Sequence, residues 1–240
     1  PSKREISWAT DARKLRRHMV PLLGTVPVRD LSKGDVEKAQ RQIAAGATAI
    51  DEKTGFRGRA IVRGGRGVAR SAVMSLSACL SWAVDQEIIA SNPCTRVKKY
   101  AQGKRERFLS EQEAARLLDT LALMEKQGAL SDVFADMTRL LLLTGARKSE
   151  IQHLEWSEVD LARGVISLPQ ERSKTGEKHI PLSAPARSLL ADRPRLNDSA
   201  FVFPSPIDPT KPADGLQKAW ERIRVRAGLA AFDLSFSIAA

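Results

Sequence analysis

Three side chains in the second half of the sequence have types and spacing suited to chemistry on an anion. Arg147 follows a Thr-Gly-Ala turn at the expected start of a helix, and Glu150 lies one helical turn further along on the same side. Lys174 lies in an expected hairpin loop, within the segment Ser-Lys-Thr-Gly. A guanidinium oriented by a carboxylate, together with an ammonium that reaches the same point, suits an anionic transition state, and phosphoryl transfer is the leading candidate. The alternative stays open that Arg147 and Glu150 form an ordinary helix salt bridge and that Lys174 is a turn lysine.

Other kinds of site find little support in the sequence. The segment Gly145–Ser149 lacks the upstream glycine and the Gly-Lys-Ser/Thr ending of a phosphate-binding loop. Two cysteines, Cys79 and Cys94, are too few for a disulfide framework or a four-ligand zinc site, and we expect both to be reduced thiols. Metal-ligand spacing is also missing among the three histidines, His18, His153 and His179. We therefore predict no metal site and no cofactor.

The net charge of +11 is concentrated in the first half of the chain. Residues 1–107 hold 22 Lys and Arg against 10 Asp and Glu, whereas residues 108–240 hold 17 against 18. No acidic residue lies between Glu52 and Asp85, where arginines alternate with glycines that let a backbone approach phosphates closely. Double-stranded DNA is the expected partner, and a solvated basic loop without a partner is the alternative. The predicted DNA-binding residues are Arg57, Arg59, Arg63, Arg66, Arg70, Lys98, Lys99, Lys104 and Arg105.

The elements that must position these residues are mostly helical. Apolar residues at spacings of three and four predict helices over 7–23, 36–44 and 68–89, which together form an all-α module of about 100 residues. A basic linker follows at 101–108. The tryptophans at 8, 82, 156 and 220 fall on apolar helical or turn positions, and we expect them to anchor the core.

The second half reads as a mixture of helices and short strands. A capping-box pattern begins at Ser110 and opens a predicted helix, and further helices are expected over 133–143, 148–154 and 215–227. The pattern changes to strands at 164–169 and 178–182, with a possible third strand at 200–203. The predicted fold is therefore mainly α with a small β component: an all-α domain at 1–100, and a mixed α+β domain at 109–240.

The order of motifs from Leu141 to Ser183 resembles the catalytic domain of the tyrosine recombinases, especially the phage-type integrases. The segment Leu-Thr-Gly-Ala-Arg is followed by Glu150, then by Leu-x-Trp-x-x-Val-Asp, then by a hairpin with Ser-Lys-Thr-Gly and Ile-Pro-Leu-Ser. Residues 8–100 resemble the helical core-binding domain of the same family, and the segments 201–204 and 220–229 follow its order. The likeness covers nearly the whole chain and is more specific after residue 105.

The resemblance implies site-specific recombination and integration of DNA. In that family a tyrosine attacks the scissile phosphate and forms a 3′-phosphotyrosyl link, without metal or nucleotide cofactor. Arg147 matches the first catalytic arginine, which clamps the non-bridging oxygens, and Glu150 matches the acidic residue that supports the site. Lys174 matches the hairpin lysine that protonates the leaving 5′ oxygen.

The sequence departs from the family pattern near its end. No His-x-x-Arg box follows Leu229, and the single tyrosine, Tyr100, lies ahead of the catalytic domain, where a packing role is expected. We therefore expect a catalytic domain truncated before the nucleophile, and a polypeptide that binds DNA without cutting it. The alternative is a non-enzymatic DNA-binding protein, a decayed or truncated integrase that occupies or blocks sites.

Location and assembly follow from the same observations. Uninterrupted apolar runs such as Leu140–Leu143 are only four residues long, and we expect no membrane span. A bacterial or phage-encoded protein of the cytoplasm, associated with the nucleoid, is predicted. Relatives in the resembled family exchange a C-terminal segment between protomers on DNA. Because we expect that segment to be missing here, we predict a monomer in solution, with assembly on DNA only if the segment is present.

Overall fold

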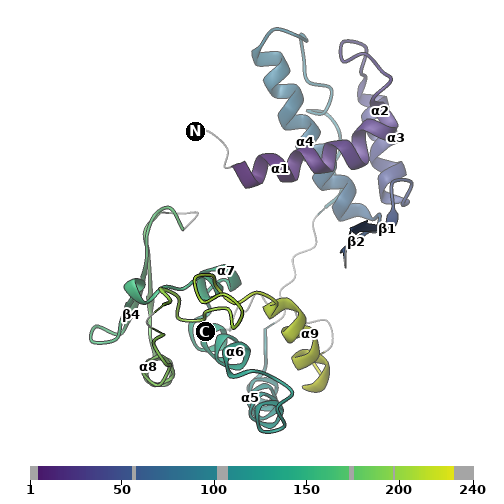
Figure 1. Cartoon of the computed structure of the whole chain (residues 1–240). Coiled ribbons are helices and arrows are strands. Elements are labelled where there is room, and N and C mark those ends of the chain that lie inside the picture. Colours follow the sequence, from purple (N-terminus) through teal and green to yellow (C-terminus); the bar gives the residue numbers. More distant parts are fainter. Residues whose placement is uncertain (1–4, 56–57, 102–107, 173–175, 197, 230–240) are drawn as a thin grey trace. The chain divides into compact units, whose positions relative to one another are not determined.

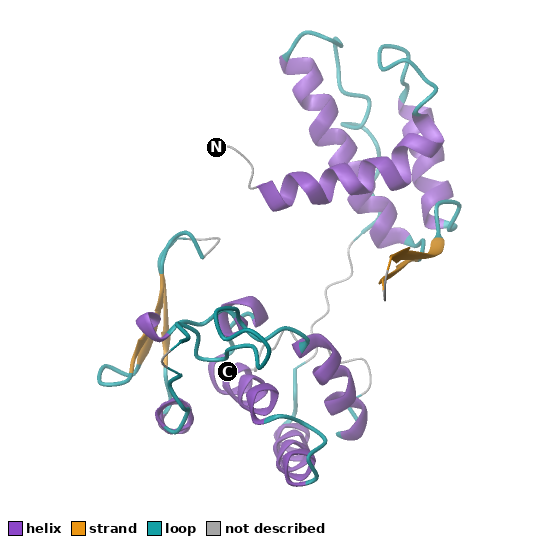
Figure 2. Ribbon diagram, viewed as in Figure 1, coloured by secondary structure: helices purple, strands orange, loops and turns teal. Residues whose placement is uncertain are grey.

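The structure is a computed structural model, and it describes residues 5–55, 58–101, 108–172, 176–196 and 198–229. The chain divides into two compact units, Pro1–Lys104 and Arg105–Ala240 (Figure 1). Each unit has its own hydrophobic core. Both are mainly helical with a small sheet, so the predicted mainly α fold with a small β component is confirmed (Figure 2).

Unit 1 is built from helices that pack on α4. The first helical stretch is continuous but contains a π-helical turn, and Ser32 with Asp35 forms the capping box that opens the next helix. In Figure 1, α1 lies across α4. Val36 and Ile43 of α3 and Val73 of α4 are fully buried in the core of unit 1, where α3 packs on α4. The elements are α1 (Glu5–Lys14), η1 (Leu15–Met19), α2 (Val20–Leu23), α3 (Lys33–Ala44) and α4 (Arg66–Asp85).

The prediction that unit 1 is entirely helical was wrong. The glycine- and arginine-rich segment, expected to be a loop, contributes to an antiparallel hairpin of β1 (Ile50–Gly55) and β2 (Gly58–Val62). Its strands lack a run of alternating apolar residues. Backbone hydrogen bonds and charged side chains hold the two strands together instead. Arg59 donates two hydrogen bonds, of 2.6 and 2.7 Å, to the diagonal carboxylate of Asp51.

The prediction that all four tryptophans anchor the core was also wrong for two of them. Trp8 of α1 is 68% exposed and Trp82 of α4 is 58% exposed, although both lie at apolar helical spacing. Together with Leu15 and Cys79 they border an open groove between the two helices. Helical spacing placed them on one face, and no described element covers that face.

Helix α4 also bears on the expectation that the chain has no membrane span. Among the described residues it is the one helix whose length and apolar composition would let it cross a bilayer. Core helices share this property, and α4 buries Ala69, Ala72 and Val73 against the rest of unit 1. We interpret α4 as a core helix, and the absence of a membrane span stays a prediction.

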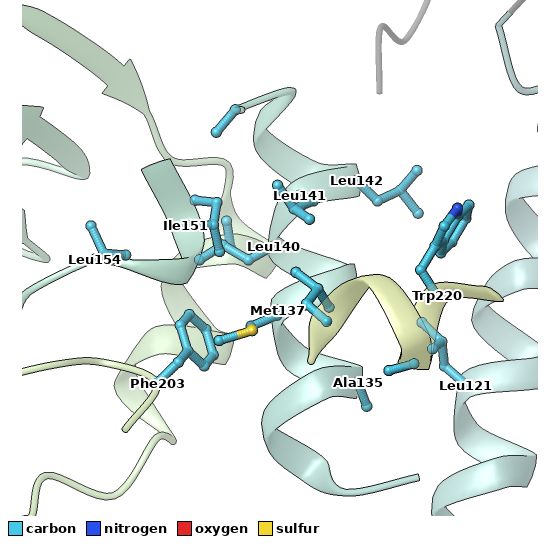
Figure 3. Close-up of a cluster of buried hydrophobic side chains, with 14 of the residues drawn as sticks. Leu121, Ala135, Met137, Leu140, Leu141, Leu142, Ile151, Leu154, Phe203 and Trp220 are labelled. Carbon is cyan, nitrogen blue, oxygen red and sulfur yellow. The ribbon is translucent and has the colours of Figure 1, made fainter. Parts of the chain in front are cut away.

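Unit 2 is organised around α6. The predicted capping box is present, since Ser110 accepts from the Glu113 N–H while the Glu113 carboxylate accepts from the Ser110 N–H. Figure 3 shows the core around α6, with Phe203 beside Met137 and, at the other end of this view, Trp220 near Leu121. The helices are α5 (Glu111–Lys126), α6 (Asp132–Thr144), α7 (Lys148–Gln152), η2 (Trp156–Glu158), α8 (Ala184–Ala191) and α9 (Leu216–Arg226).

A three-stranded antiparallel sheet completes unit 2, in the order β3 (Val159–Asp160), β4 (Val165–Leu168), β5 (Lys178–Pro181). The two strands of the predicted hairpin are present, with Ile166 opposite Ile180 and Leu168 opposite Lys178. The possible third strand at 200–203 is absent, and Phe201 makes only an isolated bridge to Glu155. The hairpin projects beyond the helices of unit 2 (Figure 2).

Candidate active site

A tight turn after α6 determines where Arg147 lies. The Gly145 N–H donates to the carbonyl of Leu141 at 2.9 Å, and Gly145 has a φ of +61°, which glycine adopts without strain. The Thr144 hydroxyl then accepts from the Ala146 N–H at 3.3 Å. The chain leaves the turn in an extended conformation at Arg147, the residue that precedes α7. The predicted glycine turn and the helix start are both present.

Glu150 is the buried centre of the site. Its side chain is 4% exposed, and it accepts 2.8 Å hydrogen bonds from both the backbone N–H and the guanidinium Nη1 of Arg147. Burial pushes the pKa of Glu150 upward, but bonds from Lys178 and from the Arg147 backbone and side chain outweigh it and hold the pKa below its ordinary value. The carboxylate is therefore ionised at neutral pH, and it orients Arg147, whose side chain remains 53% exposed.

Lys178 and Arg172 join this site, and sequence reasoning missed both. Lys178 of β5 donates from Nζ to Glu150 at 2.7 Å. Arg172, just after β4, donates from Nη2 to the Glu150 carbonyl at 3.2 Å and pairs through Nη1 with the carboxylate of Glu158. The alternation of side chains along β5 gives one indication of Lys178. Lys178 lies on the same strand face as Ile180, which is buried, so a lysine on that face needs an acidic partner.

Of the predicted catalytic residues, the structure brings Arg147 and Glu150 together. Lys174 lies outside the described residues. It belongs to the short segment between Arg172 and Gly176, whose two flanks are the arms of the β4–β5 hairpin. Both arms contact Glu150, through Arg172 on one side and Lys178 on the other.

The predicted DNA-binding residues fall into three groups. Arg63, Arg66 and Lys98 are exposed. Others are engaged within the unit: Arg59 pairs with Asp51, Arg70 donates to the Tyr100 carbonyl at 2.9 Å, and Lys99 is half-buried. Arg57, Lys104 and Arg105 lie outside the described residues.

The single tyrosine packs inside unit 1. The ring of Tyr100 lies against the core, and the Arg66 guanidinium stands 5.6 Å from its centroid. This is the packing role that the sequence predicted for Tyr100.

Each of the three histidines has its own hydrogen-bond partner. His18 is buried and hydrogen-bonds to Thr48, His153 bonds to the carbonyl of its own helix, and His179 bonds to Ser167. The described residues contain no group of three His, Cys, Asp or Glu side chains that could hold a metal ion. What the described site offers chemically is an exposed, pre-oriented guanidinium supported by a buried carboxylate, an arrangement suited to a phosphate or carboxylate ligand.

Solved structures that match this fold include two DNA-bound integrases. A lambda integrase dimer bound to a COC′ core site matches with a TM-score of 0.70 at 15% identity, covering 95% of this chain and 74% of that one. The Tn1549 transposon integrase in complex with circular intermediate DNA matches with a TM-score of 0.67 at 15% identity, covering 97% and 76%. The fold is that of the integrases.

Sequence comparison identifies the family. The model of the phage integrase family matches residues 107–236, so the chain belongs to that family. The prophage integrase IntZ of Escherichia coli K12 is 27% identical over 225 residues, which are 90% of this chain and 50% of that protein. A putative integrase/recombinase, y4rE of Sinorhizobium fredii, is 32% identical over 133 residues, 51% of this chain and 42% of that protein. The chain thus spans about half the length, or less, of these relatives. The tyrosine-recombinase resemblance of the sequence is confirmed.

Proposed function

We propose that this chain binds duplex DNA as part of a site-specific recombinase, which integrates or exchanges DNA segments. The exposed Arg147 guanidinium, held by the buried carboxylate of Glu150, is the observation that supports this function most directly. The complexes of lambda integrase and Tn1549 integrase with DNA support the choice of partner.

In the proposed reaction each residue acts on one phosphodiester. Arg147 binds the non-bridging oxygens and offsets the charge that develops there, while Glu150 keeps the guanidinium in place. A tyrosine hydroxyl gives up its proton to solvent as its oxygen attacks phosphorus, the bond to the 5′ oxygen breaks, and Lys174 donates a proton to that leaving oxygen. Reversal of the same step by another 5′ hydroxyl rejoins the strands, so neither a metal nor a nucleotide is consumed.

These 240 residues are proposed to supply binding and phosphate contact, and not the nucleophile. Tyr100 is the only tyrosine among them, and its ring is held in unit 1 beneath Arg66. The exposed cations Arg63, Arg66 and Lys98 are proposed to contact the DNA backbone. We also propose that the protein is a monomer before it meets DNA.

The test is a binding titration of labelled duplex DNA by the 240-residue protein, over a range of salt concentrations. Arg147→Ala should weaken binding about tenfold, the effect of losing one charge-assisted contact. The matched control is Arg163→Ala, which removes another exposed arginine of unit 2, from the turn between β3 and β4, and should change affinity less than about twofold. Equal losses would mean that Arg147 is one cation among many, as in a plain DNA-packaging protein.

Salt dependence tests the unit 1 cations separately. Log affinity against log salt should have a slope of about −0.9 for each phosphate contacted. Neutralising the exposed Arg63, Arg66 and Lys98 together should flatten that slope. An unchanged slope would show that these cations do not touch the DNA backbone.

A further inference from the structure

We propose that Lys178 is a positioning residue, which holds the β4–β5 hairpin against Glu150 and keeps the Arg147 guanidinium available to a phosphate. This inference rests on the proposed function and extends it to a residue that the sequence did not single out. Lys178 does not touch the DNA in this proposal. It acts through Glu150.

The division of the two carboxylate oxygens supports this role. Oε1 of Glu150 accepts from Arg147 Nη1 at 2.8 Å, whereas Oε2 accepts from the Arg147 backbone N–H at 2.8 Å and from Lys178 Nζ at 2.7 Å. Arginine and carboxylate prefer a bidentate pairing in which two N–H groups meet two oxygens. Because Lys178 occupies Oε2, the guanidinium makes a single hydrogen bond to Glu150, and among the described residues its remaining donors have no other partner, which leaves them available to a ligand.

The charges of the three groups lead to the same conclusion. Arg147 and Lys178 share one buried carboxylate, so the cluster has a net charge of +1. Without the lysine the cluster would be neutral, and Glu150 would hold the guanidinium alone. Lys178 therefore weakens the hold of Glu150 on Arg147 and increases the attraction of the site for an anion.

The position of Lys178 explains how it also holds the described arms of the β4–β5 hairpin. It lies opposite Leu168 on the inward face of β5, on the arm that follows the Ser-Lys-Thr-Gly segment. On the preceding arm, Arg172 contacts the carbonyl of the same Glu150. Glu150 is thus contacted from both arms, which sets the position of the hairpin relative to Arg147.

A double-mutant cycle on the 240-residue protein tests the route through Glu150. Lys178→Met should weaken duplex binding about tenfold, because Glu150 can then pair with the guanidinium through both oxygens. In a Glu150→Gln background the same replacement should cost less than about twofold, because no carboxylate is left to compete. An equal loss in both backgrounds would mean that Lys178 contacts phosphate directly, and would overturn the proposal.

Two further variants separate positioning from loss of charge or fold. Lys178→Arg keeps a cation beside Oε2 and should bind DNA within about twofold of the original protein. Lys211→Met removes an exposed lysine that pairs with Asp208, and it should leave binding unchanged within the same margin. If Lys178→Arg binds as weakly as Lys178→Met, or if Lys211→Met loses as much affinity, the proposal fails.

A measurement without DNA keeps this inference separable from the proposed function. Backbone amides of 165–168 and 178–180 should exchange hydrogen faster in Lys178→Met than in Lys211→Met, because one contact that holds the hairpin is lost. If the protein does not bind duplex DNA at all, the proposed function fails, while faster exchange still supports the anchoring role. Unchanged exchange overturns that role, whatever the binding result.

Discussion

Replacing Gly145 by alanine should lower the stability of unit 2 by an amount that its backbone geometry sets. Gly145 has a φ of +61°, and a Cβ built there meets no atom within 4 Å. The cost is therefore the left-handed conformation itself, about 1 kcal/mol for an L residue, with no steric clash added. For a unit of this size, that corresponds to a fall of about 4 °C in melting temperature.

Gly128 provides the matched control in the same unit. It has a φ of +64°, and a Cβ there also meets nothing within 4 Å, so Gly128→Ala should cost the same about 1 kcal/mol. The two variants should differ in DNA binding. Gly145 lies two residues before Arg147, so strain in this turn displaces the guanidinium, whereas Gly128 follows α5 and lies outside the site.

Thermal unfolding and duplex titration of the two variants test whether the Gly145 turn positions Arg147. We expect the two variants to have equal melting temperatures, and we expect DNA affinity to fall several-fold only in Gly145→Ala. If both variants bind DNA equally well, the turn serves only to end α6, and the geometric account of Arg147 is refuted. If neither variant loses stability, the argument from φ is refuted.

Three other predictions concern groups outside this turn. Burial, and then the charge of Arg17, holds the pKa of His18 below 6.5, so the unfolded chain takes up a proton before the folded chain does as the pH falls. Unit 1 should therefore lose stability from about pH 7 toward pH 5. In urea titrations His18→Gln should make the stability of unit 1 depend less on pH. Burial raises the pKa of the Cys94 thiol to about 11, so a thiol reagent near pH 8 should label the exposed Cys79 and leave Cys94 unmodified, as peptide mass mapping will show. Arg193 is 7% exposed and donates to Asp132 and Asp136, so Arg193→Met should destabilise unit 2 by roughly 2 kcal/mol in urea unfolding; an unchanged midpoint would mean that these pairs contribute nothing.

The sequence predicted α5, α6, α7 and α9 of unit 2, because their ends are encoded locally, but it missed α8. Ser110 with Glu113 marks the start of α5, and Gly145 marks the end of α6. The β1–β2 hairpin was missed because its strands have no apolar alternation, and its diagonal Arg59–Asp51 pair is recognisable only once the register is known.

Exposure was harder to predict than secondary structure. Trp8 and Trp82 occupy helical positions that normally face a core, and the spacing of residues cannot tell whether another element covers that face. Trp220, with the same spacing argument, is fully buried because α5 and α6 enclose α9. Periodicity defines a face, and only the tertiary arrangement buries it.

The site itself was predictable only where its residues are close in the sequence. Arg147 and Glu150 are three residues apart, and the capping box at the start of α7 brings them together. Lys178 reaches Glu150 from 28 residues away, which depends on where the hairpin packs. The inward-facing position of Lys178 beside Ile180 was the available indication, but a strand position cannot name the partner.

Glu150 both joins elements of the fold and orients Arg147, and removing its side chain affects both roles. As a buried carboxylate with donors on both of its oxygens, it joins α7 to the hairpin, and its removal would leave Arg147 and Lys178 without a partner. Truncating Glu150 therefore changes fold and ligand binding at once, whereas Glu150→Gln keeps the size of the side chain and removes its charge. Two other residues act separately on Arg147: Gly145 determines where the arginine lies, and Lys178 determines how tightly the carboxylate holds it. Since they act on Arg147 by different routes, combining Gly145→Ala with Lys178→Met should give additive losses of DNA affinity, and a strongly non-additive result would show that turn and hairpin move as one unit.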